Sequence, residues 1–153
     1  MDTYENLLTE AENESVIVVE KRFKSRAKGL IKKNKIGISR NIATTAEKAC
    51  ILAEEMGHYH TSCGNILDRR DVRNIKQEKR AMNWAYEKLV PLDKLISAYK
   101  AGVRGRNELA LYLDVIEDFL EGAIRHYKEK YELYTEYGGY IIYFDPLGVM
   151  EMF

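Results

Sequence analysis

The segment TTAEKACILAEEMGHYH, residues 44–60, predicts a helix that carries an informative set of polar side chains. It opens with Thr44 and Glu47 at the spacing of a capping box, in which the hydroxyl accepts from the amide three residues on and the glutamate reaches back. The apolar run that follows has helical periodicity. On this helix Glu54 and His58 are four residues apart, so both side chains can reach one metal ion.

Glu55 is the neighbour of Glu54 and is rotated from it by about 100° around the helix. From there its carboxylate could polarise a metal-bound water. This is the geometric logic of the His-Glu-x-x-His motif of zinc peptidases, with Glu54 in place of the first histidine. Taken alone, these residues favour a plainer interpretation, a solvated helix face with a Glu54–His58 pair.

The segment NIKQEKRAMNWAYEKLV, residues 74–90, predicts a second helix that ends before Pro91. Extending its apolar stripe back by one turn reaches Glu78. A carboxylate on an apolar face costs several kcal/mol unless it is paired or bound to a metal. Glu78 therefore needs a partner, either a basic side chain near the helix start or the metal that the first helix suggests. The stripe itself consists of Ala81, Met82, Ala85 and Leu89.

The chain before these helices predicts a short helix and a small sheet. Residues 3–13 have apolar side chains spaced for one helical face. Residues 15–23 are β-branched and predict either a strand or an extension of that helix. Residues 29–42 predict a β-hairpin around Lys33-Asn34-Lys35. The lysines and arginines nearby make the hairpin basic, and a solvated strand face is the plainer interpretation.

The chain after Pro91 predicts helix from residue 92 to residue 134, with a break at 102–105, and then a short strand at 140–144. Within it, residues 107–124 resemble a helix-turn-helix. The second helix of that pair is acidic, which phosphates would repel, so we expect it to pack or to hold a protein partner. A seam of tyrosines is predicted to continue the last helix at positions 127, 131 and 134.

Composition limits the class of protein. The chain has 153 residues, enough for one domain or a domain with an appendage, and 24 basic against 24 acidic side chains. A formal net charge of +0 predicts no general electrostatic affinity for nucleic acid or membranes, although it allows a local basic patch. No run of about 20 apolar residues is present, and the acidic segment at residues 1–14 predicts no signal peptide. Cys50 and Cys63 are too few for a disulfide framework, which predicts a reducing cytoplasm.

The two motif segments together resemble the ImmA/IrrE metallopeptidase family. The residues that carry the resemblance are LAEEMGHYH, at 52–60, and Glu78-x-x-Ala81-x-x-Trp84-Ala85-x-x-x-Leu89-Val90-Pro91. The usual family form is His-Glu-x-Gly-His on one helix and Glu-x-x-Ala-x-x-Phe-Ala with Leu-Met-Pro on the next. The resemblance covers residues 1–100 well and the remainder loosely. It is closest to the short type carried by prophages and conjugative elements of Gram-positive bacteria.

The resemblance implies an α+β fold in which a small β-sheet supports a zincin-like pair of motif helices, followed by a helical C-terminal part. It places a metallopeptidase-like domain at 1–98 and a helical extension with an apolar strand or tail at 99–153. It implies a zinc-dependent endopeptidase that cleaves a helix-turn-helix repressor of the same mobile element. His58 and Glu78 match zinc ligands, and Glu55 matches the general base.

Glu54 departs from the family pattern, because a histidine ligand normally stands there. A carboxylate binds zinc acceptably, so Glu54, His58 and Glu78 could hold the ion. Two carboxylates would, however, leave the zinc less electron-poor and its bound water less acidic. Another divalent metal, or a metal-free module that binds the repressor without cleavage, remains an alternative. His60 is a second candidate ligand if the helix frays. No direct nucleic-acid contact and no membrane is expected.

Overall fold

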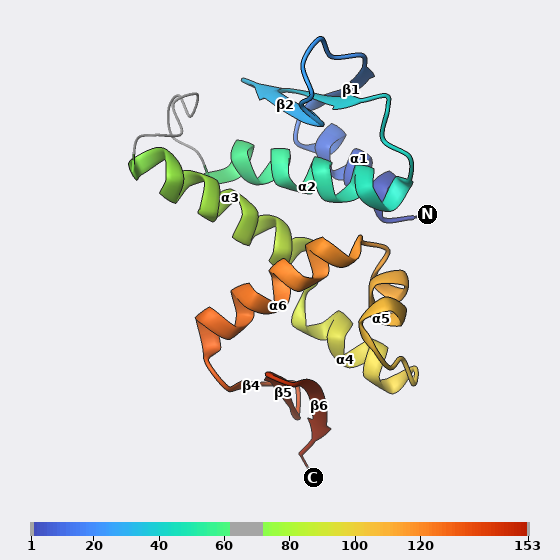
Figure 1. Cartoon of the computed structure of the whole chain (residues 1–153), viewed down its shortest axis with the longest axis vertical. Coiled ribbons are helices and arrows are strands. Elements are labelled where there is room, and N and C mark those ends of the chain that lie inside the picture. Colours follow the sequence, from blue (N-terminus) through green and yellow to red (C-terminus); the bar gives the residue numbers. More distant parts are fainter. Residues whose placement is uncertain (1, 62–71, 153) are drawn as a thin grey trace. The chain divides into compact units, whose positions relative to one another are not determined.

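A computed structural model describes residues 2–61 and 72–152, and its helices and strands confirm the predicted α+β class (Figure 1). The chain divides into two compact units, Met1–Ala85 and Tyr86–Phe153. Unit 1 contains α1 (Thr3–Asn13), β1 (Ile17–Lys21), β2 (Gly29–Lys32), β3 (Lys35–Ser39), α2 (Thr45–Thr61) and most of α3 (Val72–Leu89). Unit 2 contains the end of α3, α4 (Leu92–Lys100), α5 (Arg106–Leu113), α6 (Glu117–Tyr131), β4 (Tyr134–Tyr137), β5 (Tyr140–Phe144) and β6 (Leu147–Glu151).

The sheet of unit 1 has the order β1-β3-β2. Strands β2 and β3 form the predicted antiparallel hairpin, and β1 runs parallel to β3. The ambiguous stretch after α1 is therefore a strand, and the helix stops where Ser15 takes a positive φ of 61°. Ile36 and Ile38 are fully buried on the inner face of the sheet, against which α2 packs (Figure 1).

The start of α2 confirms half of the predicted capping box. The amide of Glu47 donates to the Thr44 hydroxyl oxygen at 3.1 Å. The carboxylate of Glu47 instead accepts from Lys28 Nζ at 2.8 Å. This ion pair ties the first turn of α2 to the chain just before β2, so the helix that carries the candidate ligands is held against the sheet at its N-terminus.

Unit 2 is built from helices α4, α5 and α6 and an antiparallel sheet of order β4-β5-β6. Its core contains Tyr127 and Phe144, whose rings stack with centroids 5.6 Å apart. The Tyr127 hydroxyl donates to the Val90 carbonyl at 2.8 Å. Burial raises the pKa of Tyr127, so this buried hydroxyl stays protonated and keeps its hydrogen bond.

In the C-terminal part, the expected break at 102–105 is present. A second break at 114–116, where Asp114 has a left-handed backbone with φ 59°, is the turn of the helix pair predicted at 107–124. The tyrosine seam does not continue beyond Tyr131, because Tyr134 lies in β4 rather than in the helix. Gly138 and Gly139 take positive φ and form the turn that pairs β4 with β5. Among the described residues, every helix is too short or too polar to cross a bilayer.

Candidate metal centre

Three of the side chains singled out in the sequence come together in unit 1. Glu54 and His58 project from α2, and Glu78 projects from α3. Each offers one ligand atom, and these atoms lie within 4.8 Å of one another. His58 Nε2 is 3.9 Å from Glu78 Oε1. The helical spacing puts the first two residues on one face, and the packing of α3 adds the third.

The geometry of the group fits a metal ion. Ligand atoms at 2.0–2.2 Å around a tetrahedral zinc are about 3.4 Å apart. The separation of 3.9 Å between His58 and Glu78 needs only a small side-chain movement to reach that value. The His58 side chain is 6% exposed and that of Glu78 is 24% exposed, so His58 is buried and Glu78 is partly exposed. The described residues therefore hold a group that could bind a divalent metal.

Gly57 allows the two helices of the site to approach closely. A Cβ built on Gly57 would overlap the backbone carbonyl oxygen of Ala81, which is itself fully buried. Gly57 precedes His58, and Ala81 follows Glu78 by three residues, so this close backbone approach lies beside the ligands. Sequence reasoning missed this contact. Its signal was the glycine itself, which costs about 1 kcal/mol relative to alanine inside a helix.

Gly57→Ala is expected to lower both the stability and the metal affinity. Alanine gains about 1 kcal/mol of helix propensity, but overlap with a backbone atom forces α2 and α3 apart at a cost of about 2–3 kcal/mol. We expect a net loss of about 1–2 kcal/mol in the free energy of unfolding, measured with urea. Zinc titration should show affinity at least about tenfold weaker, because metal ligation tolerates only about 0.2 Å of error.

A matched control for this substitution lies in unit 2. Gly122 is also helical, and a Cβ built there would overlap the Tyr86 hydroxyl. Gly122→Ala should destabilise the protein and leave zinc affinity unchanged. Equal losses of zinc affinity in the two variants would contradict the specific role of Gly57.

Glu55 follows Glu54 on α2 and is not one of the three converging residues. Its side chain is buried, with 9% of the residue exposed, and it lies against β2. A Cβ built on Gly29 would be 3.3 Å from Glu55 Oε1. The sheet and the helix therefore enclose this carboxylate beside the candidate centre on α2. Its assignment as a general base stays a prediction.

His60 has a different set of neighbours. Its Nε2 lies 2.7 Å from Glu14 Oε2, and its ring stacks on Trp84 with centroids 4.8 Å apart. These contacts hold His60 between α1 and α3, so it is not a substitute ligand in this structure. The stacking also gives a structural role to Trp84, the aromatic residue of the second motif, because its ring lies on His60 near the end of α2.

The remaining histidine belongs to an ion-pair cluster in unit 2. His126 Nε2 lies 2.9 Å from Glu87 Oε2, and Lys130 Nζ lies 3.0 Å from Glu87 Oε1. Burial alone would raise the pKa of Glu87, but the hydrogen bonds and charges of His126 and Lys130 lower it. The cluster is thus a structural one. Cys50 is a buried thiol, and Cys63 lies outside the described residues.

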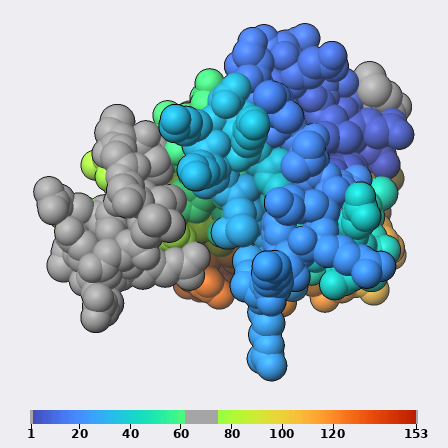
Figure 2. Space-filling model, turned by 90° about the horizontal axis from the view of Figure 1, so that it is seen from above, coloured from blue at the N-terminus to red at the C-terminus, as the bar shows by residue number. Residues whose placement is uncertain are grey.

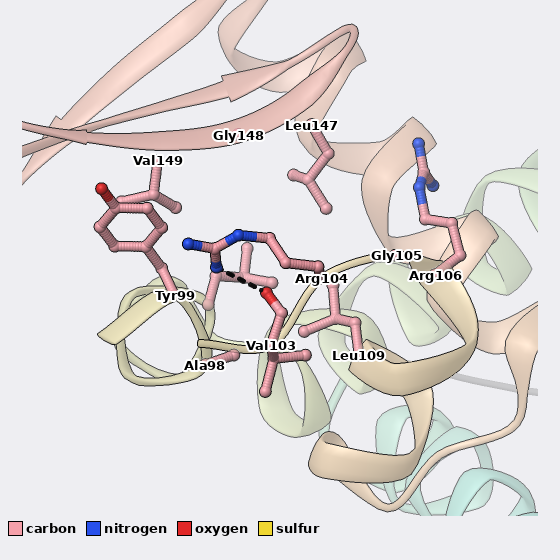
Figure 3. Close-up of a pocket in the computed structure, with 11 residues that line it drawn as sticks. Ala98, Tyr99, Val103, Arg104, Gly105, Arg106, Leu109, Leu147, Gly148 and Val149 are labelled. Carbon is pink, nitrogen blue, oxygen red and sulfur yellow. Dashed lines mark hydrogen bonds between the residues drawn. The ribbon is translucent and has the colours of Figure 1, made fainter. Parts of the chain in front are cut away.

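Unit 2 also has a pocket of about 300 Å³, bounded by α4, α5 and β6 (Figure 3). Its lining is largely apolar, and the Arg104 side chain lies along it (Figure 3). Arg104 donates to the Val103 carbonyl at 2.9 Å and stacks over the Tyr99 ring. None of the three candidate ligands lines this pocket.

The fold and the ligand group define this chain as an α+β protein with a candidate metal centre between two helices. Comparisons with protein-family models, curated proteins and solved structures found no match to the chain. The resemblance to ImmA/IrrE peptidases therefore rests on the motif residues of the sequence.

Proposed function

We propose that this chain is a zinc-dependent endopeptidase of the ImmA/IrrE type, belonging to a phage or mobile element and acting on its helix-turn-helix repressor. It would serve as an anti-repressor. The observation that carries the proposal is the convergence of Glu54, His58 and Glu78 within 4.8 Å. They stand on two helices at the positions that correspond to the ligand positions of the family.

In this proposal Glu54, His58 and Glu78 hold the metal ion. When bound, zinc supplies a Lewis acid that makes water a better nucleophile and polarises a peptide carbonyl. Glu55 accepts a proton from the attacking water and delivers it to the leaving amine. Strand β2 is an edge strand and lies against Glu55 at Gly29, so an extended peptide could pair along it beside this base.

The proposal is tested by metal content and cleavage together. Protein purified without chelator or a histidine tag should contain about one zinc per chain by mass spectrometry. Incubation with the helix-turn-helix repressor encoded beside its gene should cut the repressor. Chelator should stop the cleavage and added zinc should restore it. A chain that binds the repressor without metal and without cutting it would instead be an interaction module.

The second carboxylate at Glu54 favours that interaction module as the alternative, because it weakens the electrophilicity of the metal. Glu54→His separates the two functions. It restores the family ligand set and should lower the pKa of the zinc-bound water, which is about 7 with three histidines and about 9 in aqueous zinc. When the rate of repressor cleavage is measured against pH, the rise in rate on the acidic side should occur about one pH unit lower than in the wild type. An unchanged profile would show that Glu54 is not a ligand.

A further inference from the structure

The positive charge of this chain is segregated onto the sheet of unit 1. From Lys21 to Ala46 the sequence contains nine Lys and Arg residues and no Asp or Glu, although the whole chain is balanced at 24 against 24. This segment includes all of β2 and β3. Figure 2 shows it in blue to cyan, spread over the surface that faces the viewer.

The strand register places the lysines of the sheet on its outer face. Lys35 pairs with Ile17 on one side and with Lys32 on the other. All three are exposed, whereas Ile36, the next residue of β3, is fully buried against the helices. The outer face, defined here as Ile17, Val19, Lys21, Leu30, Lys32 and Lys35, therefore presents cations around half-exposed aliphatic side chains.

Most of these cations lack anionic partners within the described residues. Of the nine, Lys28 is the one that forms an ion pair there, with Glu47 at 2.8 Å. Lys32 and Lys35 are directly opposite each other across the hairpin, an arrangement of like charges that destabilises a strand pair. A bound anion would relieve that repulsion. The outer face therefore offers uncompensated positive charge to an anionic partner.

The type of cation distinguishes between anionic partners. Six of the nine residues are lysines, and lysine is depleted at protein–protein interfaces, whereas it is a principal contact to nucleic-acid phosphates. Although the balanced net charge predicts no general affinity for nucleic acid, we propose that the outer face of the β1-β3-β2 sheet, where positive charge is concentrated, binds the phosphate backbone of double-stranded DNA without regard to base sequence. Ile17, Val19 and Leu30 would lie against deoxyribose, the apolar part of that backbone. This activity is separate from the proposed metal chemistry.

The proposal is tested by fluorescence anisotropy with a labelled DNA duplex of about 20 base pairs, at salt concentrations from about 50 to about 200 mM. The wild-type chain should bind, and log K should fall linearly with log salt. Lys35→Glu should weaken binding at least about tenfold and reduce the slope by about 0.9 to 1.8, because it removes one phosphate contact and neutralises Lys32. The same change replaces a repulsion with an ion pair, so the melting temperature should stay level or rise.

Lys94→Glu is the matched control, because it changes the net charge equally at an exposed lysine of α4. It should change DNA affinity less than about twofold. Absence of wild-type binding at about 50 mM salt, or equal losses in the two variants, would overturn the proposal. Binding of a polyglutamate peptide without binding of the duplex would also overturn it and assign the face to acidic proteins. None of these outcomes depends on zinc, so they are independent of the test for cleavage.

Discussion

Replacing His58 by alanine is expected to reduce zinc affinity by at least about 100-fold, because loss of even an outer-shell partner costs about 10–100-fold. His58 is the imidazole of the group, is 6% exposed, and lies 3.9 Å from Glu78. Its removal leaves two carboxylates on neighbouring helices, and two anions without a bound cation repel each other. Zinc content after dialysis, measured by mass spectrometry, should fall from about one per chain to near zero.

The matched control is His60→Ala on the same helix. His60 is held by Glu14 and Trp84, so its loss should affect stability and leave the zinc content unchanged. If His60→Ala lost the metal and His58→Ala kept it, the end of α2 would have to rearrange and the ligand assignment would be wrong. Chelator treatment of the wild type gives the baseline for both variants.

The residues of the candidate centre could be predicted because residue spacing within each helix is enough to place them. Helical periodicity alone places Glu54 and His58 on one face, and it places Glu78 on the apolar stripe of the next helix. A carboxylate in that position needs a partner, and this requirement is what relates the second helix to the first. By contrast, the approach of Gly57 to Ala81 is a long-range contact, and no pattern within either helix specifies it.

The strand predicted at 140–144 is confirmed as β5, but β4 and β6 of the second sheet were not predicted, because they depend on pairing. Tyr127, Tyr131 and Tyr134 have helical spacing, and tyrosine also suits a strand. Tyr134 becomes a strand residue because it pairs with Tyr143 across the Gly138-Gly139 turn. The net charge of the chain did not reveal the basic outer face of the first sheet. A sum over all residues hides a local excess of lysine and arginine, and the strand register is needed to show which lysines share a face.

Glu55→Gln is expected to abolish repressor cleavage while the protein remains folded and keeps its zinc. General acid–base catalysis contributes about 10²–10⁴ in rate, and glutamine cannot accept the proton of the attacking water. The amide has the same shape as the acid, so it should still fit against β2 at Gly29. The rate of appearance of the cleaved repressor, measured on electrophoresis gels with zinc-loaded protein, should fall by at least about 100-fold.

The control for this variant is Glu47→Gln, at the start of the same helix, which removes a carboxylate that pairs with Lys28 and should leave cleavage unchanged. Zinc content separates the two ways in which Glu55→Gln could fail. Loss of cleavage together with loss of zinc would make Glu55 a contributor to the metal centre. Full cleavage with zinc retained would place the base elsewhere, and Glu54, the carboxylate where the family has a histidine, would become the residue to replace next.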